Sequence, residues 1–124
     1  ARVGLNEKEA KREGTPYEVT TYGLDELDRA ITDDEDEGLV KILTVPGKDK
    51  ILGVTICGYN AGNIIPEFVL AKNLGLGLGK IMGTIHIYPT AGEANKYAAG
   101  NWKKAHKPEG ILNLLRKFHA WRRT

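Results

Sequence analysis

Three side chains that can move or hold protons lie close together in residues 84–94, TIHIYPTAGEA. They are His86, Tyr88 and Glu93, and the first two alternate, so they share one face of an extended segment. A helix that begins after Pro89 would add the partial positive charge of its unpaired amide groups, which favours a nearby carboxylate or phenolate. This segment could therefore carry out acid–base chemistry.

A structural explanation is also open for Glu93 and for His86. Thr90 and Glu93 have the spacing of a capping box, in which Thr90 bonds the amide of Glu93 and Glu93 bonds the amide of Thr90. His86 could equally be a hydrogen-bonded structural histidine. The residues alone leave both interpretations open.

The elements that must position this segment follow an order of strands first and helices afterwards. Asn6 and Glu9 form a second capping box after a short strand, and residues 16–23 have the β-branched and aromatic content of another strand. Further along, Asn63 can cap a helix that ends at Gly75, and Thr90 can open a helix over residues 91–106. The order predicts an α+β fold, with helices packed on an antiparallel sheet.

Two apolar runs, GLVKILTV and KILGVTICG, are joined by a turn that contains Pro46 and Gly47. They predict a central antiparallel hairpin. Because nearly every residue is apolar, the hairpin is expected to be covered on both faces, or covered on one face and docked on a partner with the other. Cys57 lies within the second run, which predicts a buried, inert thiol.

Composition and charge exclude several classes of protein. The 124 residues suit one domain, and the net charge of +2 gives little support for nucleic acid as a partner. A single cysteine cannot form an internal disulfide, and no Cys/His spacing indicates a metal site. The sequence contains no membrane-spanning stretch, so we expect no membrane contact and a cytoplasmic location. It begins without methionine, which suggests a piece of a longer protein.

A last amphipathic helix is expected to start at Pro108 and Glu109. Its apolar residues recur at helical spacing and are Ile111, Leu114, Leu115, Phe118 and Trp121. We expect residues 107–124 to be a helical extension packed on the domain formed by residues 1–106. The same tail is rich in lysine and arginine, but its apolar stripe favours packing over nucleic-acid binding.

Three segments carry a resemblance to a known family: VGLNEKEAKREG (residues 3–14), GLVKILTVPGKDKILGVTICGYNAG (38–62) and TIHIYPTAGEANKYAA (84–99). Together they resemble the C-terminal dimerisation domain of the pyridine nucleotide-disulfide oxidoreductases, which include glutathione reductase, dihydrolipoamide dehydrogenase and mercuric reductase. The resemblance covers about residues 1–100, and the tail from Trp102 lies outside it. It implies the fold of that domain and a homodimer formed through it.

The resemblance also implies roles for residues in the 84–94 segment. In such enzymes a histidine before Pro-Thr enters the partner subunit's active site as an acid–base, and a glutamate five residues on orients it. Pro89, Thr90 and Glu93 match that pattern, while the histidine position is Tyr88 and His86 is a second candidate. Free tyrosine titrates near pH 10 and histidine near 6.5, so Tyr88 would be a poor base at neutral pH.

Mercuric reductases similarly have a tyrosine in this region, so we expect a mercuric reductase-like subgroup. The sequence does not end in the cysteine pair with which those enzymes usually capture mercury. The resemblance implies that the full-length enzyme uses FAD and NAD(P)H in cell redox homeostasis, with Tyr88 and Pro89 near the partner subunit's FAD. The chain has no GxGxxG in a βαβ unit and no CxxxxC pair, so we expect neither cofactor on this chain alone. A non-catalytic homodimerisation module is the alternative function.

Overall fold

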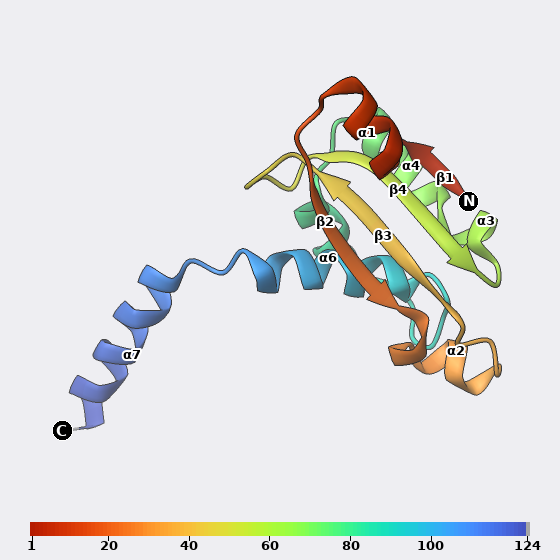
Figure 1. The fold of residues 1–124 in the computed structure, drawn as a ribbon. Coiled ribbons are helices and arrows are strands. Elements are labelled where there is room, and N and C mark those ends of the chain that lie inside the picture. Colours follow the sequence, from red (N-terminus) through yellow and green to blue (C-terminus); the bar gives the residue numbers. More distant parts are fainter. Residues whose placement is uncertain (124) are drawn as a thin grey trace.

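The computed structural model describes residues 1–123, which form a four-stranded antiparallel sheet with helices on it (Figure 1). The strands are β1 (Arg2–Gly4), β2 (Glu18–Gly23), β3 (Gly38–Thr44) and β4 (Ile51–Gly58), in the spatial order β1-β4-β3-β2. The predicted hairpin is therefore central, since β3 and β4 pair with each other and have β2 and β1 on their outer edges. The α+β fold class is confirmed.

One face of the sheet holds the core. Val40 lies opposite Ile56 and Ile42 opposite Val54, and all four side chains are fully buried. Three helices cover this face: α4 (Pro66–Asn73) packs on β4, α6 (Glu93–Ala105) packs on β2 and β3, and α5 (Leu78–Met82) packs on α6. The shorter elements η1 (Leu24–Glu26), α2 (Asp28–Thr32) and α3 (Ala61–Ile64) lie at one end of the sheet, where β2 and β4 end. The core is thus built between the hairpin and the second half of the chain.

The other face of the hairpin is only partly covered. Helix α1 (Glu7–Glu13) lies over it and is held by an ion pair of 2.9 Å between Lys41 and Glu7. Beyond α1, Leu39 and its cross-strand neighbour Cys57 are exposed. The prediction of a buried Cys57 is wrong for this single chain, because strand alternation places its side chain on the face opposite Val54 and Ile56.

The helix starts agree with the sequence in one case and differ in another. The Glu9 amide donates to the Asn6 side chain at 2.8 Å, and the Asn6 amide donates to the Glu9 carboxylate. The capping box predicted at Asn6 is therefore confirmed. Asn63 does not cap a helix. It lies inside α3, and the residue before that helix is Asn60, whose left-handed backbone (φ 60°) turns the chain out of β4 one turn earlier than expected.

The last helix, α7 (Glu109–Arg123), forms where it was predicted but does not pack on the domain. It has no buried residue, and Figure 1 shows it extending away from the sheet. The expected packing of residues 107–124 is therefore corrected for the described residues 107–123. The physical reason is that α4, α5 and α6 already cover the core face of the sheet.

The end of α6 is fastened to the start of β2 by His106. Its ring stacks on Trp102 with centroids 4.2 Å apart, Nδ1 donates to the Trp102 carbonyl at 2.8 Å, and Nε2 donates to the Glu18 carboxylate at 2.6 Å. The bond to the Trp102 carbonyl, and then Glu18, raises the pKa of His106. The Gly47 amide, followed by His106, lowers the pKa of Glu18.

These shifts predict a pH dependence of the free energy of unfolding. The His106 contribution is complete below pH 6.5 and is lost as pH rises through the raised pKa of the folded state. The Glu18 contribution is present above pH 4.5 and is lost as pH falls through the lowered pKa. Urea midpoints of the wild type should therefore fall on going from weakly acidic to alkaline pH more steeply than those of His106→Gln. His119→Gln, on the exposed helix α7, is the control; equal slopes for wild type and His106→Gln would contradict the assignment.

Candidate functional site

The segment with the predicted site residues is a loop between α5 and α6. At its start the Thr84 hydroxyl donates to the Lys80 carbonyl at 2.7 Å, which extends the last turn of α5. At its end the Thr90 amide donates to the Glu93 carboxylate at 3.1 Å. Between these anchors, Ile85 and Ile87 are 87% and 70% exposed. The loop is therefore fixed at both ends and presents apolar side chains to the outside.

His86 points away from the rest of the predicted site. Its Nε2 lies 2.8 Å from the Glu67 carboxylate on α4, and its Nδ1 lies 2.8 Å from the Thr84 carbonyl. Both partners are acceptors, so both ring nitrogens donate when the two bonds form together, as in the imidazolium. With a side chain only 8% exposed, His86 ties the loop to α4, which is the structural interpretation that the sequence left open.

Tyr88 lies on the opposite side of the loop, and its peptide bond to Pro89 is cis. Its hydroxyl donates to the Asp28 carboxylate at 2.9 Å, and 65% of the residue is exposed. The hydrogen bond to Asp28, together with the charge of Asp28, raises the pKa of Tyr88 above its usual value near 10. Tyr88 is therefore a hydrogen-bond donor at neutral pH and a weaker candidate for a general base than a free tyrosine.

Glu93 is buried, with 5% of the residue exposed, and its carboxylate has two donors. One oxygen accepts the Thr90 amide, and the other accepts the Tyr97 hydroxyl at 3.4 Å. Only half of the predicted capping box forms. The Thr90 hydroxyl donates to the Ile87 carbonyl at 2.6 Å, and α6 begins at Glu93 itself. The Thr90 side chain is thus used to close the loop and leaves the Glu93 amide to the Thr90 carbonyl.

Tyr88 and Glu93 line one cavity of about 370 Å³, whose lining residues do not include His86. Its other walls come from η1, α2, β2 and α6 and include Tyr22, Glu26, Asp28, Tyr97 and Lys104. Burial raises the pKa of Tyr22 to about 12, and burial followed by Glu93 raises the pKa of Tyr97. The cavity therefore combines protonated phenols with carboxylates. Those carboxylates would repel the pyrophosphate of a dinucleotide, so the residues present do not fit FAD or NAD(P)H in this cavity.

Sequence analysis missed Asp28 and Tyr97, which complete this cavity. Tyr97 could have been found from its spacing, because residues i and i+4 of a helix are neighbours and it follows Glu93 by four. Asp28 is sixty residues from Tyr88 in sequence, and only the tertiary fold brings the two together.

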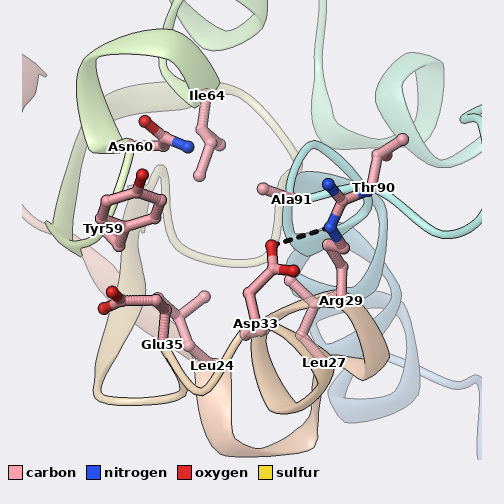
Figure 2. A pocket seen from close by; sticks show the side chains of 11 residues that line it. Leu24, Leu27, Arg29, Asp33, Glu35, Tyr59, Asn60, Ile64, Thr90 and Ala91 are labelled. Carbon is pink, nitrogen blue, oxygen red and sulfur yellow. Dashed lines mark hydrogen bonds and ion pairs between the residues drawn. The ribbon is translucent and has the colours of Figure 1, made fainter.

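A second cavity, of about 250 Å³, lies beside the loop and is shown in Figure 2. Arg29 and Asp33 form an ion pair of 2.8 Å at its edge, and Tyr59 and Asn60 lie across from them. Arg29 also donates to the Pro89 carbonyl at 3.0 Å. Helix α2 therefore holds the loop twice, through Asp28 to Tyr88 and through Arg29 to Pro89.

Metal chemistry has no support in the part of the chain that the structure describes. Residues 1–123 contain no group of three or more His, Cys, Asp or Glu side chains placed to hold a metal ion.

Comparison with known proteins gives a family match over most of the chain. Residues 1–99 match the family model described as pyridine nucleotide-disulphide oxidoreductase, dimerisation domain. Over 99 residues the chain is 42% identical to a dihydrolipoamide dehydrogenase of Chaetomium thermophilum and 44% identical to a mitochondrial dihydrolipoyl dehydrogenase of Arabidopsis thaliana. Each alignment covers 80% of this chain but only 20% of the relative, so the chain spans about a fifth of the length of these relatives.

Solved structures agree on the fold. The flavoprotein disulfide reductase RclA of Escherichia coli, as a Cu(II) complex, superposes with a TM-score of 0.74 at 20% identity, over 80% of this chain and 22% of that one. LpdA of Mycobacterium tuberculosis gives 0.72 at 18% identity, over 79% and 21%. The relatives named above are dihydrolipoyl dehydrogenases, so they do not confirm the mercuric reductase-like subgroup. The match over residues 1–99 shows that this chain belongs to the pyridine nucleotide-disulphide oxidoreductase dimerisation-domain family.

Proposed function

We propose that this chain is the dimerisation domain of an FAD- and NAD(P)H-dependent disulfide oxidoreductase, and that its 84–90 loop enters the active site of the partner subunit. The observation that carries the proposal is the exposed loop itself. Ile85, Ile87 and Tyr88 are 87%, 70% and 65% exposed, yet both loop ends are fixed by hydrogen bonds. A rigid loop with exposed apolar side chains is suited to burial against another subunit.

The similarity to dihydrolipoyl dehydrogenases favours a small dithiol or disulfide as the substrate class. For the substrate class, this similarity is stronger evidence than the tyrosine before Pro89, on which the mercuric reductase-like expectation depended. FAD and NAD(P)H would supply the redox chemistry, and domains outside this chain would hold them.

Within that scheme the loop residues have different roles. Tyr88 exchanges its hydrogen bond to Asp28 for one to the partner subunit's FAD or thiols, and Pro89 packs beside it. Glu93 positions the loop through the Thr90 amide. His86 remains a second candidate for acid–base chemistry, but its contacts with Glu67 and Thr84 favour a positioning role.

Two substitutions in the full-length enzyme test the role of Tyr88. Tyr88→Phe removes one hydrogen bond and should lower kcat about fivefold, since a hydrogen bond contributes about 1 kcal/mol. Tyr88→His introduces a group that titrates near pH 6.5, so the pH–rate profile should gain an inflection there. Tyr59→Phe, at another exposed tyrosine, is the matched control.

The alternative is a homodimerisation module whose loop has no part in catalysis. The partly open outer face of the hairpin, with Leu39 and Cys57 exposed, favours a docking role of this kind. Under this alternative, Tyr88→Phe and Tyr88→His would both retain wild-type turnover and pH profile while the enzyme sediments as a dimer. That result would remove Tyr88 from the mechanism.

A further inference from the structure

Helix α7 carries an exposed apolar stripe. Its large apolar side chains are between 39% and 72% exposed, and they are Ile111, Leu112, Leu114, Leu115, Phe118 and Trp121. Most of them recur at positions i, i+3, i+4, i+7 and i+10, which places them along one side of the helix. A continuous apolar side of this length needs an apolar surrounding to cover it.

The C-terminal region that contains α7 is strongly basic. Residues 103–123 contain a single acidic side chain, Glu109. Their seven basic side chains are Lys103, Lys104, Lys107, Arg116, Lys117, Arg122 and Arg123. Lys117 borders the stripe, in a groove that it lines with Leu114, Leu115, Phe118 and Trp121. Helical spacing places Arg116 on the opposite side, and Arg122 and Arg123 end the helix. The occupant of the stripe must therefore also accept a high density of positive charge.

We propose that α7 lies along an anionic lipid surface, with its apolar stripe among the outer acyl chains and its basic side chains at the headgroups. Leucine, phenylalanine and tryptophan on one side, with lysine and arginine on the other, are typical of helices that lie in the membrane interface. Long basic side chains next to the stripe can extend to the headgroups while their stems stay in apolar surroundings. Negative lipids supply the charge that the seven basic groups require.

Other occupants fit these observations less well. A second α7 would cover the stripe but would bring two strongly basic helices together, which is repulsive. The acidic run of residues 33–37, DDEDE, offers charge but no apolar side chain to cover the stripe. Nucleic acid would satisfy the charge and leave the stripe in water. The match to the dimerisation domain ends at residue 99, so α7 lies outside the part shared with that family.

This proposal revises the expectation that the chain makes no membrane contact. That expectation depended on the absence of a spanning segment, and within residues 1–123 no helix is long and apolar enough to span a bilayer. A helix that lies in the interface needs neither that length nor that hydropathy.

Co-sedimentation of the 124-residue chain with vesicles tests the proposal. Vesicles of phosphatidylcholine are compared with vesicles that also contain phosphatidylglycerol, at low and high salt. We expect binding to the anionic vesicles to be at least about tenfold stronger than to neutral ones and to weaken in salt. Leu114→Ser with Phe118→Ser should weaken that binding at least about tenfold through lost apolar burial, and Arg116→Gln with Lys117→Gln by a similar factor through lost charge.

Matched controls remove equivalent groups outside α7. Leu70→Ser with Leu74→Ser removes two exposed leucines from the α4 region, and Lys8→Gln with Lys11→Gln removes two exposed lysines from α1. Both controls should bind anionic vesicles as the wild type does. The proposal is overturned if the chain does not bind anionic vesicles, or if the α7 variants bind as well as the controls. It is also overturned if Leu114→Ser with Phe118→Ser lowers the sedimentation mass of the vesicle-free chain, because the stripe would then belong to a second copy.

Discussion

Phe68→Ala is expected to lower the free energy of unfolding by about 3–5 kcal/mol, the range for removal of a large buried aromatic side chain. Phe68 is fully buried in the first turn of α4 and belongs to the core cluster that includes Val54, Ile56 and Ala98. Truncation would remove its apolar surface from the core and leave a cavity between α4 and β4, the element on which this helix packs. The surrounding strands and helices cannot collapse fully into that space, so both losses add.

Urea unfolding monitored by circular dichroism measures this effect. Protein concentration must be held constant, because dimer formation would otherwise shift the apparent stability. Leu70→Ala, two residues along the same helix, is the control, since Leu70 is 59% exposed. It should change the free energy of unfolding by no more than about 0.5 kcal/mol. Similar losses for the two variants would show that α4 does not bury the face that carries Phe68.

The periodicity of apolar residues and the spacing of capping residues were enough to predict the core elements of the fold. The two apolar runs of the hairpin and the Asn6 capping box follow from local patterns, and the structure confirms them. These features are local because hydrogen bonding within a strand pair or a helix turn fixes which residues share a face.

Predictions from the sequence failed where two local interpretations compete or where segments distant in sequence meet. Cys57 and Val54 lie in the same apolar run, but a run that is apolar at nearly every residue does not show which face is covered. The Thr90 hydroxyl was expected to accept the Glu93 amide as a helix cap. It donates to the Ile87 carbonyl instead. The extension of α7 away from the sheet depends on how completely α4, α5 and α6 fill the core face, which spacing alone does not reveal.

The candidate site was also predictable only in part. Tyr88 and Glu93 were predicted and do share a cavity. His86 was grouped with them on strand alternation, but the segment is an irregular loop, so its side chain turns to Glu67 instead. The contacts of Tyr88 and Pro89 with Asp28 and Arg29 come from a helix sixty residues earlier, and no local pattern could have indicated them.

Gly53→Ala is the second substitution with a large expected effect. Gly53 is buried in β4 and faces Gly4 across the pairing with β1. A methyl group at this position would lie 1.9 Å from the Leu5 carbonyl oxygen and 2.5 Å from the Leu5 nitrogen. Both are backbone atoms, so no side-chain rotation can relieve the clash, and β1 with the start of α1 must move away from β4. We expect a loss near the upper end of the roughly 1–3 kcal/mol typical of overpacking.

Gly100→Ala makes the same chemical change as Gly53→Ala but is expected to stabilise the fold. Gly100 lies inside α6, no heavy atom lies within 4 Å of the added methyl group, and its φ is not positive. Alanine there should raise the free energy of unfolding by about 0.5–1 kcal/mol, because glycine loses more backbone entropy in a helix. Urea midpoints of the two variants should therefore lie on either side of the wild type. If Gly53→Ala is as stable as the wild type, then the close contact of Leu5 with β4 is not required, and β1 is not held to the sheet as the structure shows.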